Sequence, residues 1–188
     1  MKFEMHEGWV KGARRVPSPN CGLRPESIEP DLLVIHNISL PPGEYGGDSI
    51  ERFFCNCLDW SQHPYFEEIR GMEVSAHMLI KRCGELLQFV SCDDRAWHAG
   101  VSQYQGADNC NDFSIGVELE GTNEEPYTKA QYVVLTGLSK TLVAHYSKLD
   151  ADRIVGHSDI SPGRKTDPGP AFDWDYYRST LAAGENGK

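Results

Sequence analysis

Apolar residues recur along the chain with two periodicities, and the shorter one predicts strands. The run Leu32-Leu33-Val34-Ile35 is unbroken and ends at His36, as expected of a strand that is buried on both faces. Four more short apolar runs indicate strands, at residues 74–80, 85–90, 115–120 and 153–156. The first two of these flank Lys81-Arg82-Cys83-Gly84, which favours a hairpin. Polar and Pro/Gly-rich stretches, including a loop at residues 40–47, separate the strands.

The longer periodicity predicts three helices, each opened by a residue suited to N-capping: Asp48, Thr128 and Asp173. Thr128 and Gln131 form a capping-box pattern, and the helix behind it should reach about Tyr146. The apolar stripes are Ile50, Phe53, Phe54, Cys57 and Leu58 for the first helix, Leu135, Leu138 and Leu142 for the second, and Trp174, Tyr177 and Leu181 for the third. These stripes predict helices that pack against a common core.

Strands and helices alternate, but the hairpin comes early, so the chain is predicted to have an α/β fold with a mixed central β-sheet flanked by helices. The first thirty residues are rich in Pro, Gly, Arg and Asn and are expected to form an extended arm with turns. A chain of 188 residues suits one core, so residues 1–188 are expected to form a single domain.

Composition narrows the range of partners and compartments. The chain has 18 basic and 28 acidic residues, a formal charge of -10, which argues against binding a phosphate backbone. It has no apolar run of membrane-spanning length and no secretory h-region near its start, so a cytoplasmic protein is expected, although a trimmed signal would leave the same sequence. Six cysteines allow three disulfides, but a cytoplasmic chain of this size favours reduced, mostly buried thiols.

Three residues form a candidate metal site: His36 and His157, each at the end of a predicted strand, and Asp167. Zinc accepts imidazole nitrogen and carboxylate oxygen, and a catalytic zinc site keeps three protein ligands and one open position. Two histidines and one aspartate fit that count. Spacing alone does not decide the matter, because a chain with seven histidines offers many such triplets and ordinary surface or core histidines explain them equally well.

Several strings of the sequence resemble the AmpD proteins, which are 1,6-anhydro-N-acetylmuramyl-L-alanine amidases within the type-2 amidase and peptidoglycan recognition protein group. The strings are Arg14 to Asn20, His36 to Gly43, Trp97 to Gly100, Asn111 to Gly121, Gly156-His157 and Lys165 to Pro170. They occur in one order from about Gly8 to Leu181, which makes the resemblance specific. It implies a zinc enzyme that cuts the amide bond between the lactyl group of N-acetylmuramic acid and L-alanine in cell-wall recycling.

The resemblance also implies roles for single residues. His36, His157 and Asp167 match the zinc ligands, Glu118 matches the carboxylate that handles the proton, and Lys165 matches the residue that steadies the tetrahedral intermediate. Without the resemblance, Glu118 at a strand edge and Lys165 on a solvated loop would be unremarkable. Strand alternation places Glu120 on the same face as Glu118, so Glu120 is the competing carboxylate.

Substrate contacts are expected from Asn37, Trp97 and His98, although Asn37 also suits a turn and Trp97 also suits a core. His77 and His98 are expected to line the pocket or support the ligands rather than bind metal. At Glu73 and Asn109 the AmpD proteins tend to carry arginine, which suits the carboxylates of a stem peptide. The sequence does not choose among three basic residues as substitutes: Lys81, Arg95 and Arg164.

Two other functions compete with a cytoplasmic recycling amidase. A non-catalytic peptidoglycan-binding module on the same fold would lack a zinc ligand, whereas this chain has all three candidates and Lys165. An exported cell-wall amidase would share the chemistry but need a signal. We therefore expect a monomeric enzyme with a small muropeptide as its substrate, and neither a nucleic acid nor a membrane as its partner.

Overall fold

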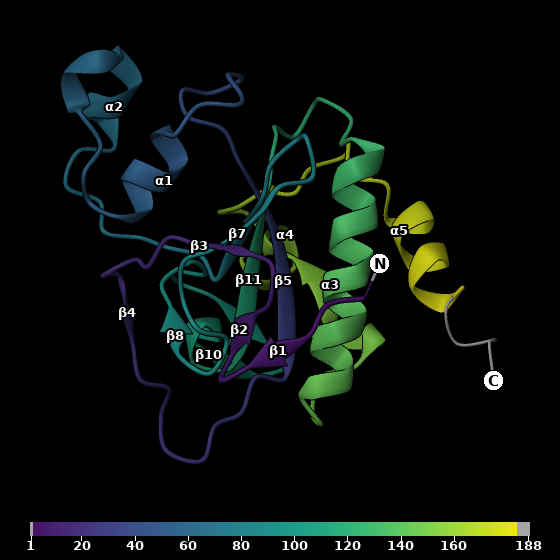
Figure 1. The fold of residues 1–188 in the computed structure, drawn as a ribbon. Coiled ribbons are helices and arrows are strands. Elements are labelled where there is room, and N and C mark those ends of the chain that lie inside the picture. Colours follow the sequence, from purple (N-terminus) through teal and green to yellow (C-terminus); the bar gives the residue numbers. More distant parts are fainter. Residues whose placement is uncertain (1, 184–188) are drawn as a thin grey trace.

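The computed structural model describes residues 2–183, and its centre is a mixed sheet of six strands (Figure 1). In spatial order the strands are β12 (Ile154–Gly156), β5 (Leu32–Ile38), β11 (Ser114–Glu120), β6 (Met78–Ile80), β7 (Leu86–Gln88) and β3 (Arg14–Arg15). The first four run parallel, β6 and β7 form an antiparallel hairpin, and β3 runs parallel to β7. The predicted fold class and hairpin are confirmed.

Two helices, α3 (Lys129–His145) and α5 (Trp174–Ala182), cover one face of this sheet (Figure 1). The predicted capping box is present: the Thr128 hydroxyl accepts from the Gln131 backbone N–H at 3.2 Å, and the Gln131 side chain accepts from the Thr128 N–H at 3.0 Å. The Asp173 side chain caps α5 by accepting from the Tyr176 N–H. Leucines of α3 pack with the apolar residues of β5 and β11 that alternation turns toward them.

The opposite face is covered by α1 (Ser49–Phe54), α2 (Pro64–Glu68), α4 (His157–Ile160) and loops. Helix α1 is shorter than predicted, because the chain turns at Asn56, which has a left-handed φ of 57°, and Cys57 is left exposed. The expected Asp48 side-chain cap is wrong: Asp48 instead accepts from the Arg52 guanidinium at 2.8 Å. In Figure 1, α1 and α2 project from the sheet on the side away from α3.

The N-terminal arm is more regular than expected. It contains the hairpin β1 (Met5–His6) and β2 (Trp9–Val10), then β3, then β4 (Cys21–Gly22), which pairs with β8 (Arg95–Ala96). The remaining short elements are β9 (Gln103–Tyr104), β10 (Ala107–Asp108) and the 3-10 turns η1 (Trp60–Gln62), η2 (Cys110–Asp112) and η3 (Ala151–Arg153). No helix among residues 2–183 has the length and apolar character to cross a membrane.

The six cysteines are all free thiols, as predicted, but the expectation that most are buried is wrong. Cys92 and Cys110 are buried, Cys21 and Cys55 are half-buried, and the other two are exposed at positions 57 and 83. Cys57 is exposed because it follows the early end of α1, and Cys83 because it stands in the hairpin turn between β6 and β7.

The pairing of β5 with β11 sets up one side of a pocket. His36 and Glu118 are direct partners in this parallel register, so both lie on the sheet face opposite α3. The next two strand ends, at Gly156 and Ile80, flank the pair on either side. The carboxyl ends of the parallel strands therefore converge where a ligand crevice is expected in an α/β sheet.

Candidate active site

A pocket of about 600 Å³ lies at these strand ends, on the face opposite α3. Its polar wall includes His36, Glu118, His157, Lys165 and Asp167. Its apolar wall comes from the α1–α2 segment and the β8 loop, with residues Phe53, Tyr65, Ile69, Met72 and Trp97. A pocket with one apolar wall and a few convergent polar groups is the usual form of a small-molecule site.

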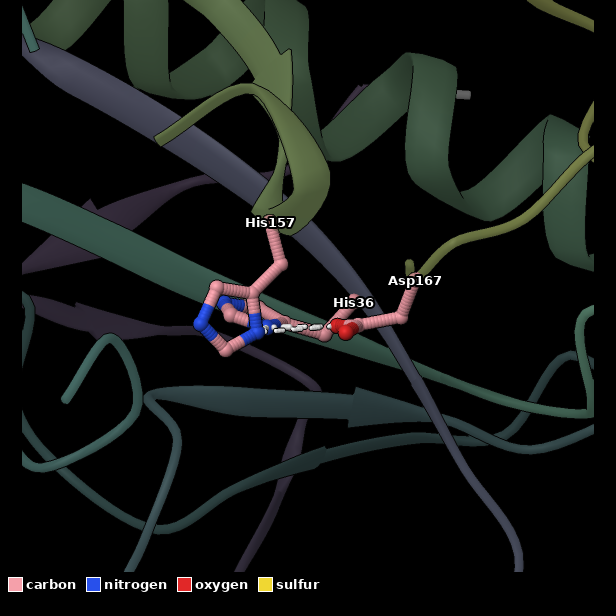
Figure 2. Close-up of side chains that lie close together, drawn as sticks. All are labelled: His36, His157 and Asp167. Atoms are coloured by element: carbon pink, nitrogen blue, oxygen red, sulfur yellow. Dashed lines mark hydrogen bonds and ion pairs between the residues drawn. The ribbon is translucent and has the colours of Figure 1, made fainter. Parts of the chain in front are cut away.

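Three candidate ligands converge at the polar end of the pocket, and Figure 2 shows their side chains pointing toward one another. His36 comes from β5, His157 is the first residue of α4, and Asp167 comes from the loop at residues 163–170. The His36 Nδ1 atom lies 3.0 Å from His157 Nδ1 and 3.1 Å from Asp167 Oδ2, and His157 Nδ1 lies 3.0 Å from Asp167 Oδ2. This compact triangle of ligand atoms can hold a metal ion.

Hydrogen bonds on the far side of each imidazole determine which nitrogen faces the triangle. The His157 Nε2 atom lies 3.1 Å from the Ala99 carbonyl, which can only accept, and 3.3 Å from the Arg164 guanidinium, which can only donate; the shorter contact favours a proton on Nε2. The Nδ1 atom of His157 is therefore a lone pair directed at the centre. An imidazole that donates its other N–H to a carbonyl is the usual arrangement for a metal ligand.

A longer chain fixes His36 in the same way. The Ser114 hydroxyl donates to the Cys110 carbonyl at 2.5 Å, so it accepts from His98 Nε2 at 3.2 Å. The Nδ1 atom of His98 is then an acceptor for His36 Nε2–H at 2.9 Å. His36 Nδ1 consequently presents a lone pair to the triangle as well.

Two lone pairs and a carboxylate oxygen thus meet within 3.1 Å with no proton required between them. Such an arrangement is repulsive unless a cation lies between the groups. Ligand atoms about 2.0–2.1 Å from a tetrahedral zinc ion are roughly 3.3 Å apart, close to the sides of this triangle. The donor set and its size therefore fit a metal ion with nitrogen and oxygen ligands.

The charges of these groups are set by burial and mutual contact. Burial lowers the pKa of His36 to about 4, so its ring is neutral at pH 7. Burial opposes ionisation of Asp167, but its close contacts with the His157 and His36 rings outweigh burial and hold the pKa of Asp167 well below its usual range. Two neutral imidazoles and one carboxylate are the protonation states that metal binding requires.

Glu118 is a buried carboxyl group at the edge of this centre. Its side chain lines the pocket, and its Oε2 atom has no hydrogen-bond partner among residues 2–183. Burial, reinforced by the negative charge of Asp167, raises the pKa of Glu118 well above its ordinary value, while the charge of Lys165 opposes this. A carboxyl group with a raised pKa and a free oxygen is suited to accept and return a proton near neutral pH.

Glu120, the competing carboxylate, is committed to the main chain. It is 2% exposed, and its two oxygens accept from the Gly46 N–H at 2.7 Å and from the Arg82 N–H at 2.9 Å. It therefore connects the loop at residues 40–47 to the β6–β7 hairpin.

Lys165 lines the pocket on the loop that carries Asp167, and its ammonium group forms no hydrogen bond or ion pair within the described part of the chain. The expected basic substitutes for the two missing arginines are, by contrast, engaged. Arg164 donates to the Ala99 and Val101 carbonyls, Lys81 pairs with Glu51 at 2.9 Å, and Arg95 pairs with Asp112 at 2.6 Å.

The expected substrate-contacting residues lie at the pocket, but they differ in how many of their polar atoms already have hydrogen-bond partners inside the protein. Trp97 is half-buried on the pocket wall. His98 also reaches the pocket, yet both of its ring nitrogens are used by His36 and Ser114. Asn37 donates its amide hydrogens to Asn123 Oδ1 at 2.8 Å and to the Pro168 carbonyl at 3.0 Å. Their contacts with substrate remain predictions.

His77 supports the sheet rather than the pocket. Its Nδ1 atom accepts from the Gly116 N–H at 3.0 Å, and its Nε2 atom lies 3.1 Å from the Asp94 carbonyl. Sequence reasoning missed Ser114 and Asn123. The signal for Ser114 and His98 is Gly116, because a Cβ there would lie 2.5 Å from the His98 ring, and glycine inside a strand marks close approach.

Comparisons with known proteins agree with this geometry. The model of the N-acetylmuramoyl-L-alanine amidase family matches residues 26–170. The 1,6-anhydro-N-acetylmuramyl-L-alanine amidase AmpD of Salmonella typhimurium strain LT2 is 56% identical over 176 residues, covering 94% of each chain. AmpD of Escherichia coli strain K12 is 56% identical over 174 residues, covering 93% of this chain and 94% of that protein.

Solved structures show the same likeness. A crystal structure of a selenomethionine derivative of AmpD has a TM-score of 0.92 and 53% identity, covering 95% of this chain and 99% of that one. The Escherichia coli amidase AmiD, in complex with the substrate anhydro-N-acetylmuramic acid-L-Ala-D-γ-Glu-L-Lys, has a TM-score of 0.60 and 27% identity, covering 95% of this chain and 65% of that one.

Proposed function

Because the chain belongs to the N-acetylmuramoyl-L-alanine amidase family, we propose that it is a zinc enzyme that cuts 1,6-anhydro-N-acetylmuramyl peptides between the lactyl carbonyl and L-alanine. The observation that carries the proposal is the triangle of His36, His157 and Asp167 beside Glu118, whose Oε2 atom has no hydrogen-bond partner among residues 2–183. The AmpD relatives support the anhydro sugar as the substrate class.

His36, His157 and Asp167 would hold the zinc ion. Bound there, zinc supplies a Lewis acid that lowers the pKa of water and polarises a carbonyl group. The hydrogen-bond chains through Ala99 and His98 hold both imidazoles with Nδ1 directed inward. The ligand set is therefore oriented before the metal arrives.

Glu118 is the proposed proton carrier. Hydrolysis joins a water oxygen to the lactyl carbonyl carbon, breaks the carbon–nitrogen bond, and leaves a carboxylate and the amine of L-alanine. Glu118 takes the proton that the attacking water loses and delivers it to the departing nitrogen. Its raised pKa and free oxygen suit both steps.

Lys165 is proposed to stabilise the negative charge that develops on the carbonyl oxygen. It lines the same pocket and its ammonium group is not committed to another side chain within residues 2–183. A fixed positive charge near that oxygen acts on charge that exists only in the transition state. Trp97, on the facing wall, offers an aromatic surface to the sugar or the peptide.

We further propose that the protein is a monomer that acts in the cytoplasm on imported cell-wall fragments. The similarity to AmpD over nearly the whole chain supports this role. The stem peptide is held without the two arginines expected at positions 73 and 109, where this chain has Glu73 and Asn109.

One digest tests the function. Purified protein is incubated with soluble 1,6-anhydro-muramyl peptides and, separately, with intact sacculi, and the products are identified by mass spectrometry. The proposal requires free anhydro-N-acetylmuramic acid and a peptide that begins with L-alanine, with the soluble substrate cut much faster. Comparable rates on sacculi would indicate an exported wall amidase, and no cleavage of either substrate would indicate a binding module.

A further inference from the structure

The loop at residues 163–170 carries both Lys165 and Asp167, so its position governs two groups of the site. It has no regular secondary structure. Its backbone is held by the Ser158 N–H, which donates to the Asp167 carbonyl at 3.0 Å, and by the Ser161 carbonyl, which accepts from the Arg164 and Lys165 N–H groups. The Arg164 guanidinium also donates to the Ala99 and Val101 carbonyls. Around Asp167, three side chains outside the loop provide further attachments: Asn37, Asn123 and Tyr127.

Asn37 and Asn123 form a continuous link from β5 to this loop, which we call the amide clamp. Asn37 Nδ2 donates to Asn123 Oδ1 at 2.8 Å and to the Pro168 carbonyl at 3.0 Å. Asn123 Nδ2 donates to the Thr166 hydroxyl at 2.7 Å. The clamp therefore contacts the residue on each side of Asp167.

The two amides are well matched to this task. A primary amide has two N–H donors, and Asn37 uses both inside the protein. Asn37 cannot donate to a substrate without releasing either Asn123 or Pro168. The Tyr127 hydroxyl donates to the same Pro168 carbonyl at 2.8 Å, which leaves that oxygen with two donors.

The main chain around Asn123 is also in close contact with the end of the loop at residues 163–170. The Ala171 N–H donates to the Asn123 carbonyl at 3.0 Å. Gly169 has a φ of +81°, and a Cβ there would lie 2.4 Å from Asn123 Cα. Only glycine allows this approach, so the loop is seated directly on the segment that carries the clamp.

We propose that Asn37 and Asn123 are positioning residues that place Asp167 against His36 and so increase the affinity of the site for metal. Asn37 follows His36 on β5, and Pro168 follows Asp167, so the Asn37–Pro168 bond ties together the neighbours of two candidate ligands. The inference rests on the proposed zinc site and adds that residues without metal contact set its strength. Outer-shell partners of this kind typically change metal affinity by roughly 10- to 100-fold.

The test uses zinc release rather than activity. Full-length zinc-loaded protein is mixed with a chromophoric chelator, and zinc affinity is measured for the parent, Asn37→Ala, Asn123→Ala and the double variant. Each single variant is expected to bind zinc about 10-fold or more weakly. The double variant should lose less affinity than the two single losses combined, because either change alone already removes the Asn37–Asn123 bond. In Asn123→Ala, which changes no expected substrate contact, KM for the anhydro-muramyl peptide should stay near the parental value.

Asn56→Gly is the matched control. Asn56 exchanges amide hydrogen bonds with Asn20 at 2.8 Å in another part of the molecule, and glycine tolerates its left-handed φ of 57°. This variant should bind zinc like the parent. Tyr127→Phe is the milder second variant, because it removes only the hydroxyl that donates to Pro168, and a smaller loss of affinity is expected from it.

The outcomes separate the two proposals. Parental zinc affinity in Asn37→Ala and Asn123→Ala, or a raised KM as the only change, would overturn the clamp and make Asn37 a substrate contact. Additive losses in the double variant would overturn the single link. A parent protein that fails to bind zinc at all would instead overturn the proposed zinc site itself.

Discussion

Glu118 and Glu120 project from the same face of β11, and only Glu118 keeps a carboxylate oxygen without a partner among residues 2–183. Glu120 uses both oxygens to hold the Gly46 and Arg82 backbone N–H groups. The two residues have the same chemistry and similar burial, so their hydrogen bonds distinguish the acid that can move a proton from the acid that fixes a loop.

Glu118→Gln should therefore lower kcat by roughly 100-fold or more, because the amide keeps the volume but cannot take a proton. Zinc content and substrate binding should remain. Steady-state kinetics and metal analysis on the same preparation check both statements.

Glu120→Gln is the companion change. An amide offers one acceptor oxygen where two are needed, so the free energy of unfolding should fall by about 1–3 kcal/mol while zinc binding persists. Urea unfolding measures this. Near-parental turnover in Glu118→Gln together with an inactive but stable Glu120→Gln would reverse the two roles.

Asp167→Ala should lose most of the bound zinc, because it leaves two neutral imidazoles and removes the only anionic ligand of the triangle. The parent should contain one zinc ion per chain after purification without chelator. Changing all six cysteines to serine should leave that content intact, although the buried Cys92 and Cys110 positions should cost stability. Elemental analysis is the measurement, and zinc loss in the cysteine-free variant would point to a thiolate site.

Lys165→Ala should reduce kcat with little change in zinc content, as expected for a group that acts on the transition state. Lys148→Ala is the matched control, because Lys148 is exposed and its Nζ atom forms only a long surface ion pair, 3.9 Å from Glu29 Oε2. Zinc analysis beside the kinetics separates the roles. A Lys165→Ala protein that lacks zinc would show that the residue supports the metal loop rather than the reaction.

The metal-free protein should become less stable as the pH falls from about 7 to 5, the range in which unfolded histidine titrates. Burial lowers the pKa of His36 to about 4, that of His77 to about 3, and that of His98 well below its ordinary 6.5. As the pH falls, these histidines take up protons in the unfolded chain but stay neutral in the folded chain. The free energy of unfolding therefore decreases toward acid pH.

Glu118 opposes this trend, because its raised pKa makes the folded chain the better proton acceptor as the pH falls. Urea unfolding of the metal-free parent should show a net loss of stability, since three histidines act against one carboxyl group. Glu118→Gln removes the opposing group and should make the decline steeper. A parent with constant stability across this range, or a variant with a shallower decline, would contradict the assigned burial of these groups.

Strands that are buried on both faces were predicted well, because such strands are continuous apolar runs in the sequence. The run Leu32 to Ile35 and the residues 115–120 became β5 and β11 because both strands are covered on both faces. The length of helix α1 was overestimated, because the helix ends before Asn56, which has a left-handed conformation. The presence of an asparagine is not enough to predict that conformation from sequence. Cysteine exposure was likewise set by turns that composition does not encode.

The site was predicted less evenly. The two histidine candidates end predicted strands and the resemblance selected them together with Asp167; the structure brings all three together. Alternation alone left Glu118 and Glu120 equivalent, and the hydrogen bonds that separate them come from distant backbone at Gly46 and Arg82. Asn123 escaped notice because it belongs to a loop without periodicity and acts on a loop more than forty residues away.

The register of β5 against β11 has a consequence for engineering. His36 and Glu118 are ladder partners, so the main-chain spacing of about 4.8 Å between adjacent strands sets how far the proton carrier stands from the first ligand. The distance is therefore a property of the main chain, although Gly116 in β11 must stay glycine because a Cβ there would lie 2.5 Å from the His98 ring. Deleting one residue between Leu32 and Ile35 would instead turn His36 toward α3, where its side chain would be buried among the leucines of that helix. A transplant of this centre to another scaffold must therefore begin with two neighbouring parallel strands in this register.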